Sequence, residues 1–383
     1  MRAVCTIIAK NYMSFARTLA KSFLSLHPND QVYVLIVDEF EGYVTVEDEC
    51  FEIVTLSDLD IPNVRSLCFK YNLKELCTAV KARLLDYLLR NSSIEQLLYL
   101  DPDILVTHDL DQLFDRLQTQ DIVLTPHLDK DYPSDGLLPD DRHILRAGQF
   151  NLGFIGVNSS RNAQAFLNWW TDKLDEHCVV DVQNGYFVDQ RFIDFVPVLF
   201  ENFWIERDTG YNVAYWNLHS RKLSRANGGW RCNDGPLHFF HFSGYEFQGN
   251  NISSHIPLSV ARHTLLNRSD LGELFSEYTE SLLKHEYKET IDWPYTYGVF
   301  TSGKAIPDHV RSYYRERGDA NRLGDPFASA ELMELAQSRA GEVSAHETAT
   351  VQLNSILNSR AWSWVARYGR LKARLSRILG SNA

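Results

Sequence analysis

The sequence has no paired cysteine motif and no hydrophobic run long enough to cross a membrane. Its six cysteines are scattered over 383 residues, without a Cys-x-x-Cys and without the paired Cys/His spacing of a zinc site. Unclustered cysteines in a chain of this length favour reduced thiols over a disulfide framework. Residues 32–37 are among the longer apolar runs, well short of the roughly 20 residues of a spanning helix. No signal-peptide cleavage site follows the apolar stretch after Met1, so we expect a cytoplasmic protein.

Positive charge is also scarce. The chain has 38 lysines and arginines against 50 aspartates and glutamates, which gives a formal net charge of -12 at pH 7. A surface this acidic repels the phosphate backbone, which argues against nucleic acid as a partner. Hydrophobic residues make up 44% of the chain and aromatics 12%, enough to build a core and to exclude wholesale disorder.

The last 29 or so residues differ in charge from the rest. Residues 355–383 contain six basic side chains and no acidic one. Apolar side chains recur there at helical spacing, at Trp364, Tyr368, Leu371, Leu375 and Ile378. A basic amphipathic helix is typical of an interfacial anchor, so we expect this tail to bind anionic lipids at the cytoplasmic face of the inner membrane. The alternatives are a terminal helix docked on the acidic body and a helix that pairs with a coiled-coil partner.

Strand and helix signals alternate through the first 125 residues. Short apolar runs predict strands at residues 4–9, 31–37, 51–56, 96–100 and 122–125. Apolar spacing near 3.6 residues predicts helices at residues 14–26, 73–89 and 110–117. This alternation predicts an α/β fold, with a Rossmann-like, mostly parallel sheet flanked by helices on both faces.

The remaining residues indicate four segments along the chain. Residues 185–250 are rich in aromatics, Asn and Gly, which predicts an irregular acceptor-binding half followed by C-terminal helices. We divide the chain into a catalytic domain (1–255), a helical C-terminal extension (256–330), a linker or polar helix (331–354) and the basic tail helix (355–383).

Two aspartates follow the strand predicted at residues 96–100. Pro102 holds Asp101 extended, and in extended chain positions i and i+2 point the same way. Asp101 and Asp103 should therefore face one point beyond the carboxyl end of the sheet, where ligands of such sheets bind. Two converging carboxylates suit Mg²⁺ or Mn²⁺, which would neutralise a leaving diphosphate. An isolated Asp-x-Asp is commonly a solvated turn, but the apolar strand before it favours a metal site.

Residues 98–106, Leu-Tyr-Leu-Asp-Pro-Asp-Ile-Leu-Val, and residues 109–114 after them closely resemble glycosyltransferase family 8 and its bacterial relatives. The resemblance covers about residues 1–250. It implies the GT-A fold and the transfer of a sugar from a nucleotide-sugar donor. It also maps the family's metal-binding Asp-x-Asp onto Asp101 and Asp103.

The His-Phe-x-Gly motif of the family resembles residues 241–244. The resemblance implies that His241 completes the metal site and that Gly244 belongs to the donor site. His238 is the competing histidine, but in a strand the two would lie on opposite faces. The Lys-Pro-Trp that often follows this motif in the family is missing, and Tyr-Glu-Phe stands at residues 245–247 instead.

Two further motifs occur in the family's order. Residues 150–158 resemble its Asn-x-Gly strand, which implies that Asn151 and Gly153 line the sugar site. Residues 187–190 resemble its Asp-Gln motif, which implies that Asp189 and Gln190 are the catalytic residues. An ionised Asp189 would act as a base or stabilise positive charge on the sugar ring, although a bare Asp-Gln also suits a helix cap.

Donor and acceptor contacts are also predicted at strand ends and in the irregular half. The predicted donor-binding residues are Ala9, Lys10, Tyr12, Asp38 and Lys81, with Arg83 as the alternative to Lys81 on the same helix. Flat aromatics cover sugar faces and amides bond hydroxyls. On that basis the predicted acceptor-binding residues are Asn212, Trp216 and Asn217.

The sequence therefore predicts a metal-dependent hexosyltransferase. It would move a hexose from a nucleotide sugar, a UDP-sugar by preference, to a glycan or lipid-linked acceptor in cell-surface polysaccharide or glycolipid synthesis. The resemblance favours retention of anomeric configuration. Two alternatives stay open: a haloacid-dehalogenase-like phosphatase that uses Asp101 and Asp103, and a catalytically silent sugar-binding scaffold.

Overall fold

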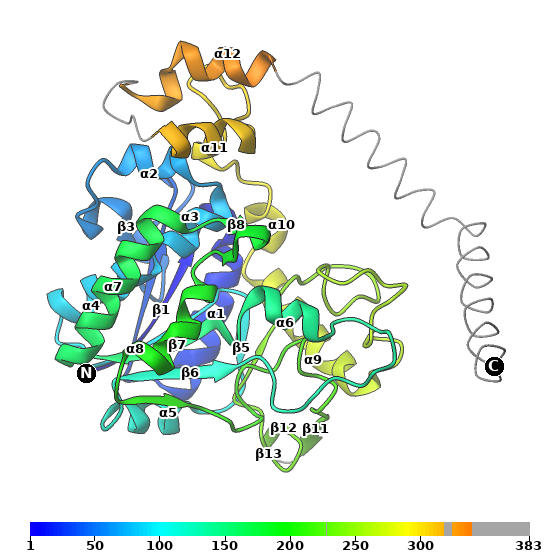
Figure 1. Ribbon diagram of the computed structural model, residues 1–383. Coiled ribbons are helices and arrows are strands. Elements are labelled where there is room, and N and C mark those ends of the chain that lie inside the picture. The colour runs from blue at the N-terminus through cyan, green and yellow to red at the C-terminus, as the bar shows by residue number, and fades with distance from the viewer. Residues whose placement is uncertain (227, 318–323, 339–383) are drawn as a thin grey trace, which may run out of the picture. The chain divides into compact units, whose positions relative to one another are not determined.

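The computed structural model describes residues 1–226, 228–317 and 324–338 (Figure 1). It divides into two compact units, Met1–Gly298 and Val299–Ala383. The basic tail predicted at residues 355–383 and the linker predicted beyond residue 338 lie outside the described residues. Within the described part of the chain, no helix combines the length and apolar character needed to cross a membrane. The six cysteines are unpaired, as predicted.

A seven-stranded sheet forms the centre of the first unit, in the order β10-β6-β7-β4-β1-β2-β3. Its strands are β1 (Arg2–Ile8), β2 (Gln31–Ile36), β3 (Glu52–Thr55), β4 (Gln96–Leu100), β6 (Ile122–Pro126), β7 (Phe150–Asn158) and β10 (Phe203–Ile205). Every neighbouring pair is parallel except the two that involve β7, which runs antiparallel to β4 and β6. The predicted mixed α/β fold with a mostly parallel sheet is confirmed.

Helices cover both faces of this sheet because its strands are apolar on both faces. Leu98 and Leu100 of β4 join one core cluster with Phe23 and Phe114, which belong to α1 (Met13–Leu26) and α5 (Asp111–Leu117). Tyr99 points to the other face, where Lys81 of α4 (Lys81–Asn91) lies over its ring. There α4 packs side by side with α7 (Arg161–His177) (Figure 1).

One predicted helix is in fact two. Residues 73–89 form α3 (Leu73–Ala79) and α4, separated at Val80, whose ψ is 0°. Val80 is itself buried, so the apolar spacing continues through the break and conceals it. A new helix begins after the break at Lys81. The Lys81 side chain is buried and contacts Asp189 and the Leu152 carbonyl, which are distant in the sequence. Those tertiary contacts override the local pattern.

The rest of the first unit consists of small sheets and short helices around the carboxyl end of the main sheet. Its elements are β5 (Ile104–Val106), β8 (Val180–Asp181), β9 (Tyr186–Phe187), β11 (Leu223–Ala226), β12 (Gly229–Cys232), β13 (Gly235–Pro236), β14 (Phe239–His241), α2 (Val64–Lys70), α6 (Asp141–Ala147), α8 (Val196–Leu199), α9 (Gly272–Lys284) and α10 (Tyr287–Thr290). The boundary predicted at residue 255 falls inside this unit, because Leu274 and Tyr278 of α9 pack with Phe15 of α1.

The described part of the second unit contains α11 (Asp308–Arg317) and α12 (Ala330–Ser338). Glu331 joins these two helices. Its carboxylate pairs with Arg317 at 2.8 Å and accepts a hydrogen bond from Tyr313 at 3.0 Å.

Candidate metal and sugar-transfer site

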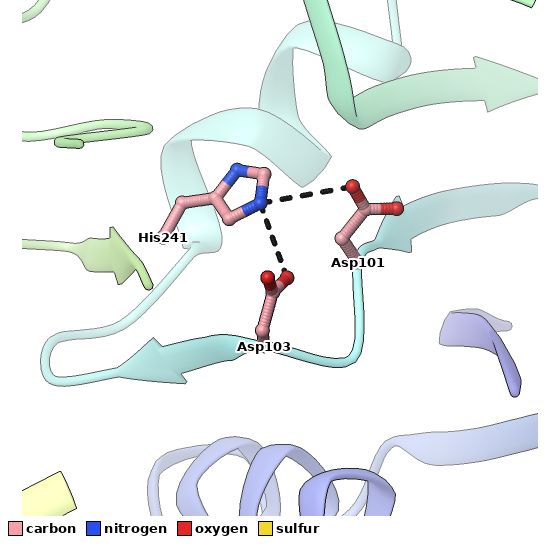
Figure 2. A group of neighbouring side chains, drawn as sticks. All are labelled: Asp101, Asp103 and His241. Atoms are coloured by element: carbon pink, nitrogen blue, oxygen red, sulfur yellow. Dashed lines mark ion pairs between the residues drawn. The ribbon is translucent and has the colours of Figure 1, made fainter. Parts of the chain in front are cut away.

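Two strands bring a histidine to the aspartate pair. β5, which follows Asp103, pairs antiparallel with β14, and the register sets His241 opposite Ile104. The Phe242 amide donates a hydrogen bond to the Asp103 carbonyl at 2.8 Å. This bond continues the β5–β14 pairing by one residue and holds Asp103 next to the end of β14. Figure 2 shows the result: His241 Nε2 lies 3.1 Å from Asp103 Oδ1 and 3.7 Å from Asp101 Oδ2.

These three side chains can hold a divalent metal ion. One ligand atom from each of Asp101, Asp103 and His241 lies within 4.8 Å of the others. The two carboxylates are oxygen ligands of the kind that Mn²⁺ and Mg²⁺ prefer, and the imidazole nitrogen suits a divalent transition metal. The structure therefore brings together the three residues that were predicted to share one metal ion.

The charges of these residues shift the pKa values of their neighbours in the site. Burial lowers the pKa of His241, but the charge and hydrogen bond of Asp103 outweigh burial and raise it. Burial likewise raises the pKa of Asp103, and His241 more than reverses that rise. The lowered pKa keeps the Asp103 carboxyl in the ionised form that a cation site requires.

The orientation of His241 is set from behind by Asn212. The Asn212 Oδ1 lies 3.3 Å from His241 Nδ1, so the other ring nitrogen faces the carboxylates. The Asn212 amide in turn donates to Asn151 Oδ1 at 3.0 Å and to Thr125 Oγ1 at 2.8 Å. Asn212 is buried with a left-handed φ of 49°, a conformation that asparagine tolerates better than most residues.

Gly153 provides the room for this ring. A Cβ at position 153 would overlap the His241 imidazole and lie 2.8 Å from Asn151 Oδ1. The Gly153 carbonyl also accepts from the Asp101 amide at 2.8 Å. This residue must therefore be a glycine because of close packing, not because of its backbone angles.

A buried ion pair lies beside the three candidate metal ligands. Lys81 Nζ is 2.7 Å from Asp189 Oδ2 and 3.8 Å from Asp101 Oδ1, and it donates to the Leu152 carbonyl at 2.7 Å. Burial raises the pKa of Asp189, and the Lys81 ammonium offsets part of that rise. Tyr99, two residues before Asp101 on the same strand face, donates to Asp101 Oδ1 at 2.8 Å. Tyr99 is not among the site residues predicted from the sequence, although its i, i+2 spacing from Asp101 was a usable signal.

Asp189 and Gln190 enter the site from an irregular segment. Val188, which precedes them, has a φ of 43°, a strained value for a β-branched residue. Asp189 does not cap the 3₁₀ turn that follows, since its side chain makes no cap hydrogen bond. Gln190 Oε1 accepts from the Leu152 amide at 3.1 Å, and its Nε2 donates to the Ala147 carbonyl at 2.8 Å. Among the described residues, the second N–H of this amide has no hydrogen-bond partner.

These groups border one cleft of about 410 Å³. Of the predicted site residues, those at its wall are Lys81, Asp101, Asn151, Gly153, Asp189, Gln190, Trp216 and His241. The buried amides of Asn212 and Asn217 lie behind that wall; Asn217 donates to the Asn212 carbonyl at 3.0 Å. Trp216 packs edge-on against His241, with ring centroids 5.2 Å apart.

Five predicted donor-binding residues lie outside the border of this cleft: Ala9, Lys10, Tyr12, Asp38 and Gly244. Lys10 and Asp38 form a buried ion pair at 3.0 Å. Thr296 bonds to both partners of this ion pair. Its hydroxyl accepts a hydrogen bond from Lys10 Nζ at 3.1 Å, and its backbone N–H donates one to Asp38 Oδ1 at 3.0 Å. Ala9 is buried, and the ring of Tyr12 stacks on Phe15.

Gly244 has a φ of 71°, the left-handed region that favours glycine. A Cβ there would lie 2.5 Å from Ser253 Oγ and 2.9 Å from His255 Cδ2. The loop after His241 therefore packs tightly against residues 253–255. Ser243 and His255 both border the cleft, so this loop forms one of its walls.

Comparison with known proteins finds remote similarity to glycosyltransferases. No family model matches the sequence. YfnF of Bacillus subtilis (strain 168), which is described as uncharacterized, is 27% identical over 297 residues, covering 76% of this chain and 95% of YfnF.

The chain is also similar to two solved structures at low sequence identity. The galactosyltransferase LgtC, solved with donor and acceptor sugar analogues, matches with a TM-score of 0.43 and 15% identity, over 73% of this chain and 95% of LgtC. The glycosyltransferase GlyE of Streptococcus pneumoniae TIGR4 matches with a TM-score of 0.42 and 16% identity, over 78% of this chain and 66% of GlyE. The case for the chemistry of this chain rests on its own side chains.

Proposed function

We propose that this protein is a metal-dependent glycosyltransferase that moves a hexose from a nucleotide sugar, with UDP as the preferred nucleotide, to a saccharide or lipid-linked acceptor. The observation that carries the proposal is a single cleft bordered by two different sets of groups. One set, Asp101 and His241 with Asp103 behind them, suits a divalent ion. The other, Asp189 and Gln190, suits a sugar.

The metal ligands would hold Mn²⁺ or Mg²⁺ at the carboxyl end of β4. When bound, such an ion neutralises the charge that develops on a leaving nucleoside diphosphate. Asn212 keeps His241 Nε2 turned toward the carboxylates, and Tyr99 holds the carboxylate of Asp101. Both contacts fix the ligands before substrate arrives, which spares reorganisation during the reaction.

Asp189 and Gln190 would act on the transferred sugar. The carboxylate of Asp189, fixed by Lys81, stabilises positive charge on the sugar ring as the leaving group departs. The free N–H of the Gln190 amide and the neighbouring Asn151 orient sugar hydroxyls. Retention of configuration is proposed from the family resemblance alone.

A panel of nucleotide sugars incubated with the protein and Mn²⁺ tests this proposal. We expect at least one sugar to be released or transferred, and that activity to be lost in Asp103→Ala. Phosphatase activity without a sugar donor would instead favour the haloacid-dehalogenase-like alternative. Donor binding without turnover, with every acceptor tried, would favour the silent scaffold.

For residues 355–383 we propose binding to the anionic cytoplasmic face of the inner membrane, on the basis of their sequence. The full chain should float with vesicles containing phosphatidylglycerol, whereas residues 1–354 should not, because each basic residue near such a surface contributes about 1 kcal/mol. Flotation is the measurement, with phosphatidylcholine vesicles as the control. Equal flotation of the two proteins would contradict the anchor.

A further inference from the structure

Two lysines border the cleft, and their environments differ. Lys81 is buried and paired with Asp189 and Asp101. Lys74, near the start of α3, is exposed. Among the residues that the structure describes, no carboxylate pairs with Lys74. Its charge is therefore available to a ligand in the cleft.

The backbone that carries Lys74 is held in place. The Asn72 side chain accepts from the Glu75 amide at 3.1 Å, and Glu75 Oε2 accepts from the Asn72 amide at 3.2 Å, so the first turn of α3 is capped in both directions. Glu75 Oε1 also accepts from the Val180 amide at 3.3 Å. The Lys74 ammonium lies 5.2 Å above the ring of Phe187, which favours this rotamer through a cation–π contact.

Lys74 also lies near the loop that follows His241. His255 borders the cleft and packs against Gly244 of that loop. Burial lowers the pKa of His255, and the charge of Lys74 lowers it further while that of Asp103 opposes the change. Lys74, Asp101 and His241 all border this same cleft, so a ligand bound there would lie between α3 and the candidate metal ligands.

We propose that Lys74 binds the diphosphate of a nucleoside diphosphate donor beside the metal ligands. This inference rests on the proposed function. A diphosphate that binds one divalent ion still carries net negative charge. A lysine ammonium is a suitable second cation to bind it. The loop at residues 245–247 offers no basic side chain, and Lys74 borders the same cleft as Ser243, which precedes that loop.

The test is calorimetric titration of wild type and Lys74→Gln with UDP in the presence of Mn²⁺, with GDP and ADP in parallel. Loss of one charge-assisted contact should weaken diphosphate binding about tenfold or more. Binding of the monophosphate of the same nucleoside should change by at most about threefold, because the second phosphate is absent. Lys74→Arg should retain most of the affinity.

Lys222→Gln is the matched control, since Lys222 is exposed and lies away from the border of the cleft; it should bind as wild type does. Unchanged diphosphate binding by Lys74→Gln would overturn the inference, as would an equal loss for diphosphate and monophosphate. Failure of the wild type to bind any of the three diphosphates would instead contradict the proposed function itself.

Discussion

Replacing Lys81 by methionine should abolish sugar transfer and lower the free energy of unfolding by about 3 kcal/mol. Methionine keeps most of the side-chain volume but removes the ammonium 2.7 Å from Asp189 and 3.8 Å from Asp101. Removing one partner leaves a buried carboxylate without compensation, which is what makes such a substitution costly. Denaturant unfolding gives the stability, and release of sugar from the donor gives the activity.

A double variant separates the two effects. Lys81→Met combined with Asp189→Asn removes the unpaired charge, so most of the lost stability should return. Activity should not return, because the carboxylate proposed to act on the sugar is gone. If the double variant were as unstable as the single one, the ion pair would not be the source of the loss. If Lys81→Met alone kept wild-type turnover, the pair would not position a catalytic group.

Gly153→Ala should weaken binding of Mn²⁺ by about a hundredfold and reduce sugar transfer at least as much. The new methyl group would overlap the His241 ring and crowd Asn151 Oδ1, so the imidazole must turn away from the carboxylates. Disturbing the groups around a metal ligand costs about 10- to 100-fold in affinity, and overpacking costs about 1–3 kcal/mol of stability. Titration with Mn²⁺ measures the first effect directly.

Gly272→Ala is the matched control for this substitution. Gly272 begins α9, and a Cβ there meets no atom within 4 Å. An alanine should therefore be neutral or stabilising at this position, with Mn²⁺ affinity unchanged. Wild-type Mn²⁺ affinity in Gly153→Ala would show that His241 is not a ligand.

Local rules were enough to predict the aspartate pair. The extended residue before Pro102 and the period of two in extended chain place Asp101 and Asp103 at one point, and the structure confirms it. The sheet could also be predicted, since its strands are short apolar runs between helices with apolar spacing. His241 required the family resemblance, because no spacing connects it to the aspartates before β5 and β14 pair.

Contacts between distant segments could not be predicted from spacing. Lys81 is predicted to bind the donor, but its pairing with Asp189, far along the chain, could not be predicted. Asn212 was predicted to meet the acceptor, yet its amide is buried against His241 and Asn151. In both cases the residue type was informative, but its partner depends on how β7 and the segments around it pack.

The central claim is that Asp101, Asp103 and His241 hold a divalent ion on which sugar transfer depends. The most direct test measures sugar release from a nucleotide-sugar donor before chelation, after chelation with EDTA, and after Mn²⁺ is restored. Wild type should lose its activity with the chelator and regain it with Mn²⁺, whereas Asp103→Asn should stay inactive at every Mn²⁺ concentration. Undiminished release after chelation, or wild-type release by Asp103→Asn, would contradict the claim.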